Sequence, residues 1–196
     1  MKYELLLNLT EEYGGILKTA DVLKAGVSKT YLMDYVKAYH FEKLANGIYL
    51  SPDAWRDELY ILQLRFPGLI YSHNVSLYLF DLNDREPTRY TATVRRGYNA
   101  KKPRELGVAV YTVKRELYEM GVTTTMTTMG HEVKLYSPER TICDILRPNA
   151  NVEMQDRQTA LKEYVSRKDR DIPMLMEYAK NLKVDKELKK YLEVLL

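Results

Sequence analysis

The first part of the chain shows short apolar patterns that change repeatedly from helical to extended spacing. Residues 5–13 carry apolar side chains three and four positions apart, and Gly14-Gly15 follows as a helix C-cap would. Residues 16–18 are extended. Thr19 is the expected N-cap of a second helix, over residues 20–25. The pattern therefore predicts two short helices separated by a short strand.

A third helix is predicted from Lys29 onward, with Ser28 as its N-cap. One side of this helix is expected to face inward and carries Tyr31, Leu32, Tyr35, Val36 and Tyr39. The other side is expected to face solvent and carries Lys29, Thr30, Met33, Asp34 and Lys37. Two short helices joined by a Gly-containing turn are typical of a helix-turn-helix.

A β-hairpin is predicted directly after the third helix. Residues 41–45 and 48–50 read as strands around Asn46-Gly47, a dipeptide that favours a type I′ turn because both of its residues tolerate positive φ. A hairpin in this position is a wing. The sequence therefore predicts a winged helix-turn-helix domain over residues 1–52.

Ser51-Pro52-Asp53 breaks the pattern and marks the predicted domain boundary, with Asp53 as the N-cap of a following helix. In residues 53–196 strands are expected over 69–72, 89–96, 107–113, 122–127 and 132–136. Helices are expected over 74–81, after the Ser137 N-cap, and in three further segments up to residue 195. The predicted fold class is α+β: a winged helix-turn-helix, then an α+β domain with an antiparallel or mixed sheet and a helical tail. Residues 53–196 are expected to fold without the first domain.

The net charge alone does not indicate a nucleic-acid partner, because it is only +3. The distribution of charge is more informative. The segment between Gly14 and Gly47 contains five lysines and three acids, a net charge of +2, whereas the first helix carries Glu4, Glu11 and Glu12. The candidate DNA contacts are Lys18, Lys24, Ser28, Lys29, Thr30, Lys37, Lys43 and Asn46. The alternatives are lysines that only solvate a small domain, and a helix-turn-helix that docks protein.

A second basic cluster lies in the carboxy-terminal part. Residues 95–104 contain five bases and no acid, namely Arg95, Arg96, Lys101, Lys102 and Arg104, with Tyr98 among them. Such a segment is suited to phosphates, with Tyr98 available to stack on a base. A solvated hairpin tip explains the same composition equally well.

No enzyme chemistry is predicted. The usual phosphate-loop, zinc and acyl-transfer motifs are missing from the sequence, so we expect no catalytic residue, no metal and no cofactor. Cys143 is interpreted as a small core residue, and Arg140 with Asp144 as a structural pair four residues apart. Ser72-His73-Asn74 is interpreted as a strand-to-helix turn in which Ser72 or Asn74 caps the helix, without an acid or base partner nearby.

The apolar runs are far shorter than a membrane span requires, and an acid at Glu4 interrupts any signal-peptide pattern. With a single cysteine, this predicts a cytoplasmic protein without a membrane partner.

Several strings together resemble one protein family over nearly the whole chain. They are Gly14-Gly15-Ile16-Leu17, residues 24–28, residues 44–49, residues 57–60, residues 71–74, residues 96–99 and Pro138-Glu139-Arg140-Thr141-Ile142-Cys143-Asp144. In order and spacing they are similar to the AbiEi-type abortive-infection antitoxins of bacterial type IV toxin-antitoxin systems.

The resemblance implies an amino-terminal winged helix that binds inverted repeats in the promoter of its own operon and represses it. It also implies a carboxy-terminal domain that counters a nucleotidyltransferase toxin without a stable complex between the two proteins. We expect a monomer that binds the repeats cooperatively, with Arg95, Arg96, Tyr98, Lys101, Lys102 and Arg104 as the candidate antitoxin or cooperativity surface. Two other functions stay open: a winged-helix adaptor that binds protein, and an enzyme acting on nucleic acid or on the toxin.

Overall fold

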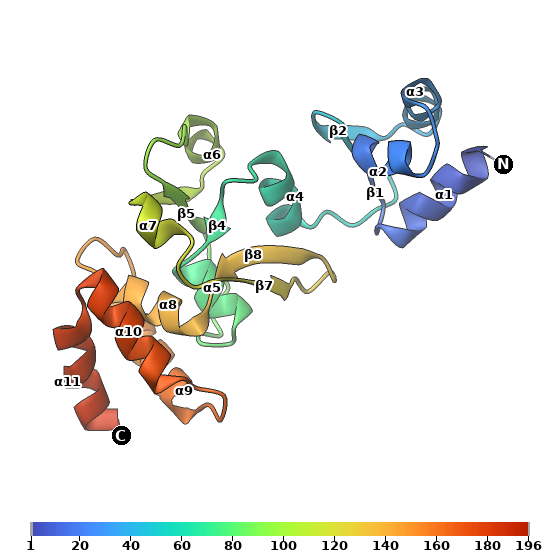
Figure 1. Cartoon of the computed structure of the whole chain (residues 1–196). Helices are drawn as coiled ribbons and strands as arrows, with labels where there is room; N and C mark the ends of the chain where they lie inside the picture. The colour runs from blue at the N-terminus through green and yellow to red at the C-terminus, as the bar shows by residue number, and fades with distance from the viewer. Residues whose placement is uncertain (1, 196) are drawn as a thin grey trace. The chain divides into compact units, whose positions relative to one another are not determined.

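The fold is mixed α+β with two sheets, in a computed structural model that describes residues 2–195 (Figure 1). It divides into two compact units. The first comprises the chain through Pro67 together with Thr128–His131, and the second comprises Gly68–Thr127 and the chain from Glu132 onward. Residues 53–67 thus share contacts with the first unit, although the predicted boundary lay at residue 52. Independent folding of residues 53–196 stays a prediction.

The first unit consists of four helices and one antiparallel sheet with the strand order β1-β3-β2. Its elements are α1 (Lys2–Glu12), β1 (Ile16–Lys18), α2 (Thr19–Lys24), α3 (Lys29–Ala38), β2 (Glu42–Ala45), β3 (Ile48–Leu50) and α4 (Glu58–Arg65). Their order and type agree with the predicted pattern. Apolar side chains from α1, α2, α3 and β3 form one core, in which Leu6 and Leu32 are fully buried.

Two of the predicted helix caps in this unit are wrong. The N-cap of α2 is Lys18 rather than Thr19, which is the first helical residue and whose amide donates to the Gly47 carbonyl of the hairpin at 2.8 Å. The N-cap of α4 is Asp57 rather than Asp53, and its carboxylate accepts a hydrogen bond from the Tyr60 amide at 3.1 Å. The chain between Ser51 and α4 is therefore not helical, and its Trp55 is 84% exposed.

The β2–β3 hairpin is present, but its turn is not type I′. Positive φ is found at Gly47 (72°) and not at Asn46. The register of β2 against β3 shifts between Lys43 and Ala45, which marks a bulge. Because a bulge supplies part of the strand twist, one left-handed glycine is enough to close the turn.

The second unit contains a five-stranded mixed sheet with the order β6-β5-β4-β8-β7. Its strands are β4 (Ile70–Tyr71), β5 (Thr91–Arg95), β6 (Ala109–Val113), β7 (Val122–Met126) and β8 (Glu132–Tyr136). Pairs β4–β5 and β7–β8 are antiparallel, whereas β5–β6 and β4–β8 are parallel. The structure thus selects the mixed sheet from the two predicted arrangements.

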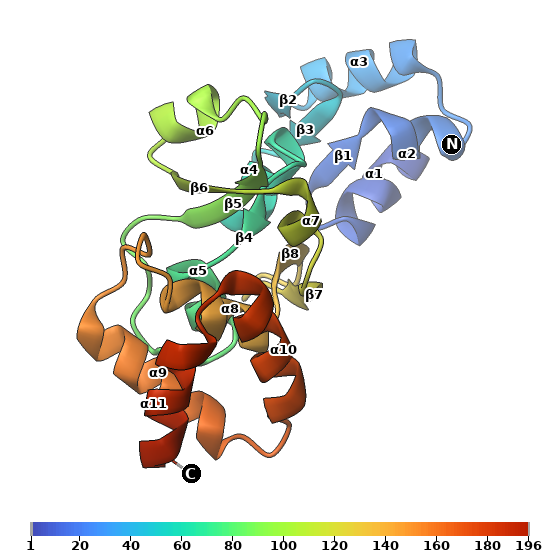
Figure 2. The ribbon, with the colours of Figure 1, turned by 60° about the vertical axis from the view of Figure 1, so that its left-hand side comes forward.

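The helices of this unit connect the strands and then form a layer of their own. They are α5 (Asn74–Leu79), α6 (Lys101–Glu105), α7 (Arg115–Tyr118), α8 (Pro138–Ile145), α9 (Met154–Ser166), α10 (Ile172–Leu182) and α11 (Asp185–Leu195). Helices α8 to α11 gather at one end of the unit (Figure 2). They share one apolar core, in which Ile142, Leu161 and Leu188 are fully buried. Ser137 caps α8 as predicted, by accepting a hydrogen bond from the Arg140 amide.

The sequence did not predict α6 and α7. Strands β5 and β6 are parallel, so the chain between them must cross over rather than turn back, and α6 is the middle of that crossover. The interpretation of residues 95–104 as a hairpin tip is therefore wrong. Among the helices described, none is long and apolar enough to cross a bilayer.

Candidate nucleic-acid interface

Helix α3 has one buried and one exposed side, close to the predicted division. Leu32, Tyr35 and Val36 are buried in the core of the first unit. The exposed residues include Lys29, Thr30, Asp34 and Lys37. Three residues differ from the predicted division. Tyr31 and Tyr39 were expected to face inward but are exposed by 41% and 52%, and Met33 was expected to face solvent but is half-buried. Met33 contacts the core through its sulfur, to which the Tyr49 hydroxyl donates at 3.7 Å.

The exposed side of α3 carries unpaired lysines in its first and last turns, Lys29 and Lys37. Lys29 and Lys37 have no carboxylate within 4 Å among the residues that the structure describes, and Thr30 is exposed in the first turn. Ser28 is less available, because its hydroxyl accepts the hydrogen bond from the Tyr31 amide that caps the helix. Lys29, Thr30 and Lys37 therefore form the free polar part of this side of α3.

The other candidate contacts of the first unit differ in availability. The Lys18 ammonium donates to the Tyr60 hydroxyl at 2.7 Å and is half-buried, so it is directed toward α4. Lys24 lies 3.7 Å from the Asp21 carboxylate. Lys43 on β2 and Asn46 in the turn are both exposed. Lys18 is consequently the weakest of the predicted phosphate contacts.

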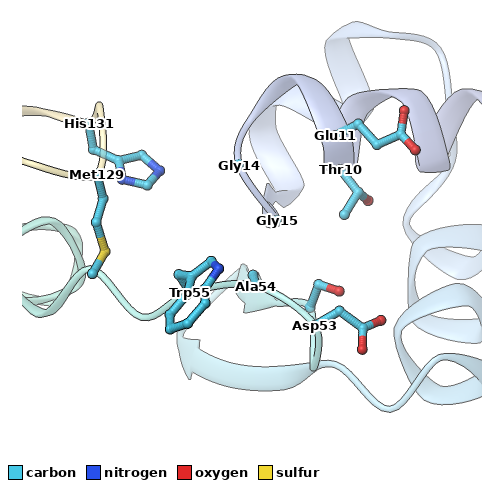
Figure 3. A pocket seen from close by; sticks show the side chains of 10 residues that line it. Thr10, Glu11, Gly14, Gly15, Asp53, Ala54, Trp55, Met129 and His131 are labelled. Carbon is cyan, nitrogen blue, oxygen red and sulfur yellow. The ribbon is translucent and has the colours of Figure 1, made fainter.

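A hollow of about 540 Å³ lies elsewhere in the first unit (Figure 3). Its lining includes Glu11 and Asp53, together with the exposed side chains of Trp55 and Met129. The lining has no lysine or arginine. Two carboxylates repel a phosphate, so this hollow is unsuited to nucleic acid.

A histidine contact near the hollow could not be predicted from the sequence. The His131 ring bonds through Nδ1 to the Asp57 carboxylate at 2.9 Å and stacks on the Tyr60 ring at 4.4 Å. Asp57 therefore serves both this histidine and the N-terminus of α4. The two partners are 74 positions apart, a separation that leaves no local pattern.

In the second unit, the five bases of residues 95–104 are all exposed, at the end of β5 and along α6. Tyr98 is only half-exposed, and its ring is so close to Gly68 that a Cβ there would lie 2.6 Å from Cε2. Burial raises the pKa of Tyr98. One edge of the Tyr98 ring therefore packs on the chain at Gly68, and stacking of its exposed part on a base stays a prediction.

The Ser72-His73-Asn74 turn is a buried polar cluster rather than a simple cap. His73 Nδ1 lies 2.9 Å from Ser72 Oγ, and Thr93 Oγ1 donates to the same hydroxyl at 2.9 Å. The Tyr111 ring stacks on His73 at 3.7 Å. Neither Ser72 nor Asn74 caps α5; His73 is at the N-cap position and makes no side-chain cap bond. The partners of His73 are thus a hydroxyl and an aromatic ring, and no bond from an acid or base to this histidine is found among the described residues.

His73 combines backbone strain with a perturbed imidazole. Its φ of 52° and ψ of −126° fall in a region that suits glycine, and such strain persists only where the surroundings impose it. Burial lowers the pKa of His73 to about 4, with Arg147 and Arg140 acting in the same direction and Asp144 opposing them. The ring is therefore neutral at physiological pH, and only 3% of the residue is exposed.

Cys143 and the Arg140–Asp144 pair are buried and have structural roles. Cys143 is fully buried, and burial raises the pKa of its thiol far above the range where a thiolate forms. In the part of the chain that the structure describes, no three His, Cys, Asp or Glu side chains are grouped to hold a metal ion. The Arg140–Asp144 ion pair is present at 3.0 Å.

No protein-family model matches the chain, and neither does any curated protein. Among solved structures, the fold is similar to the crystal structure of the RV2827C protein from Mycobacterium tuberculosis, with a TM-score of 0.61. That match covers 97% of this chain and 79% of the other, at 12% sequence identity. At this identity the similarity shows a shared fold.

Proposed function

We propose that the first unit is a winged helix-turn-helix domain that binds DNA, with α3 as the recognition helix and the β2–β3 hairpin as the wing. The observation that carries the proposal is the exposed, unpaired set of Lys29, Thr30 and Lys37 on α3, beside a hairpin that exposes Lys43. In helix-turn-helix complexes the first turn of the recognition helix enters the major groove. Lys29 and Thr30 lie in the first turn of α3.

We further propose that the chain is an AbiEi-type antitoxin that represses its own operon by binding inverted repeats. Its second unit counters a nucleotidyltransferase toxin without a stable complex, and the protein acts as a monomer that binds the repeats cooperatively. The support for this step is the series of strings shared with that family, together with the order helix, strand, helix, helix, hairpin in the first unit.

The DNA-binding proposal is tested by substituting Lys29 and Lys37 with alanine together. We expect at least about tenfold weaker binding to the promoter upstream of the gene in an anisotropy assay, because two phosphate or base contacts are lost. The slope of log affinity against log salt should flatten by about 2. Both side chains are exposed, so the melting temperature should change little.

The matched control replaces Lys180 and Lys186, which are also exposed but lie on the carboxy-terminal helices. It removes the same charge and should leave promoter affinity within twofold. Equal weakening by both double variants would show a net-charge effect, and unchanged affinity of the α3 variant would remove the recognition-helix assignment. A protein-binding adaptor is the function that would then be favoured.

The antitoxin proposal is tested by an alanine variant of Arg95, Arg96, Lys101, Lys102 and Arg104. All five side chains are exposed, so the variant should stay folded. We expect it to lose protection against the toxin or cooperative binding to the promoter repeats, measured in cells and by mobility shift. A folded variant that protects and represses as well as the parent would exclude this surface from both activities.

One specific observation favours an enzymatic second unit as the alternative: the strained, buried Ser72–His73 pair between β4 and α5. Substituting Ser72 and Thr93 with alanine removes the two hydroxyls around the histidine. Full protection by a folded variant of this kind would count against the enzyme.

A further inference from the structure

The second unit carries more exposed basic residues around strands β5 and β6 than the sequence cluster alone contains. Between residue 95 and the end of α7 at Tyr118 there are seven bases against two acids, Glu105 and Glu116. Beyond the five predicted residues, the structure adds Lys114 and Arg115, both exposed at the end of β6 and the start of α7. We define the crossover surface as these seven residues: Arg95, Arg96, Lys101, Lys102, Arg104, Lys114 and Arg115.

The parallel pairing of β5 and β6 brings the two ends of this segment together. Arg95 is in register with Val113, and the Arg96 amide donates to the Val113 carbonyl at 2.8 Å. Lys114 and Arg115 therefore follow directly beside Arg95 and Arg96, although nearly twenty positions separate them in sequence. Figures 1 and 2 both show α6 and α7 next to these two strands.

Most of this charge is unneutralised. Among the described residues, Arg95, Arg96, Lys102, Lys114 and Arg115 have no carboxylate within 4 Å. Glu105 lies 3.9 Å from Lys101, and Arg104 directs one guanidinium nitrogen to the Val110 carbonyl at 3.4 Å. Five unpaired cations on neighbouring elements repel one another, and an anionic partner relieves that repulsion.

The aromatic side chains of this surface, Tyr98 and Tyr118, are partly buried against the chain at Gly68. Tyr98 packs on Gly68, and the Tyr118 hydroxyl donates to the Gly68 carbonyl at 3.0 Å. A single-stranded nucleic acid gains much of its binding from bases stacked on free aromatic rings. A duplex keeps its bases inside and presents a dense row of phosphates, which this surface fits better.

We infer that the crossover surface is a phosphate-binding site for double-stranded DNA, independent of base sequence and additional to the α3 site. It binds through Arg95, Arg96, Lys102, Lys114 and Arg115, with Lys101 and Arg104 at its margin. This inference stands on the second unit alone, so it does not require that α3 binds an operator.

The test uses the full chain and a 30-base-pair DNA duplex without the promoter sequence, followed by fluorescence anisotropy over a range of salt concentrations. The variant carries alanine at Arg95, Arg96, Lys102, Lys114 and Arg115. Its matched control carries alanine at five exposed lysines of the carboxy-terminal helices and the loop between two of them: Lys162, Lys168, Lys180, Lys186 and Lys189. Circular dichroism and melting temperature confirm that both variants are folded.

We expect the crossover variant to bind the duplex at least about tenfold more weakly at low salt. Its log-log salt slope should be less steep than that of the parent by about 3 to 4, since each lost phosphate contact contributes about 0.9. The control variant should stay within threefold of the parent. The single strand of the same length should bind more weakly than the duplex.

Three results would overturn the inference. Equal weakening in both variants would show a response to net charge only. Unchanged binding in the crossover variant would show that the surface contacts no phosphate. A single strand that binds as tightly as the duplex, and loses as much affinity in the variant, would assign the surface to single-stranded nucleic acid. The Lys29/Lys37 variant, tested on the same duplex, measures the contribution of α3 separately. A failure of the crossover-surface inference is therefore distinguishable from a failure of the α3 proposal.

Discussion

Arg140→Met should destabilise the protein by about 3 to 5 kcal/mol, because the substitution removes the buried partner of the Asp144 carboxylate and leaves it only the partly exposed Arg147 at 3.6 Å. Arg140 is completely buried, and its Nε donates to Asp144 at 3.0 Å. Its Nη1 donates to the carbonyls of Leu117 and Met120 at 2.6 and 2.8 Å. The guanidinium also lies over the Tyr136 ring, 4.1 Å from its centre. One side chain thus joins α8 to the end of α7 and to β8.

Urea unfolding followed by circular dichroism measures this effect, and a shift of the melting temperature by roughly 10 °C should accompany it. Arg147→Met is the matched control. Its guanidinium is partly exposed and lies 3.6 Å from the other Asp144 oxygen, so its loss should cost less than about 1 kcal/mol.

A double variant, Arg140→Met with Asp144→Leu, separates two explanations of the loss. Replacing both charges by apolar groups also removes the buried Asp144 carboxylate, so the double variant should recover part of the stability. If it is no more stable than Arg140→Met alone, the carbonyl contacts to Leu117 and Met120 carry the stabilisation instead.

Acidification should destabilise the protein through His73 by about 3 kcal/mol between neutral pH and pH 4. Burial lowers the pKa of this histidine from its ordinary value of 6.5 to about 4. The unfolded chain therefore takes up the proton at a higher pH than the folded protein does. Stability from the neutral ring is complete above about pH 6.5 and is lost progressively as the pH falls from about 6.5 to about 4.

The measurement compares the free energy of unfolding at pH 7 and pH 4 for the parent and for His73→Gln. Other groups contribute to the acid sensitivity of both proteins, so the difference between the two is the informative quantity. The variant should lose about 3 kcal/mol less than the parent over this range. His40→Gln, at an exposed histidine, is the control and should change as the parent does. Equal acid sensitivity of the parent and His73→Gln would contradict the buried neutral state.

Local patterns determined most of the secondary structure. The spacing of apolar residues and the Ser28 and Ser137 caps located α3 and α8 correctly, because helix periodicity and capping depend on residues within one or two turns. The short helices α6 and α7 could not be predicted in this way. Helix α6 has five residues with Pro103 inside it, and α7 has four, so neither offers a periodic pattern.

The residues of the candidate interfaces likewise include some that the sequence located and some that it did not. Lys29, Thr30 and Lys37 could be placed on one exposed side of α3 from helical spacing alone. The sequence also located the five bases of residues 95–104, but not Lys114 and Arg115 beside them. That neighbourhood exists because β5 pairs with β6 in parallel, and strand direction is set by the crossover rather than by either strand.

By itself the sequence determined the mixed α+β class, the order of the long elements, the hairpin around Gly47 and the ion pair of Arg140 with Asp144, four residues apart on one helix. Only the tertiary structure decided the rest. It buried that ion pair, directed Lys18 toward Tyr60, packed Tyr98 on Gly68 and placed His73 against Ser72, Thr93 and Tyr111. The physical reason is distance along the chain: burial and charge pairing depend on which remote segments meet, and no local spacing records that.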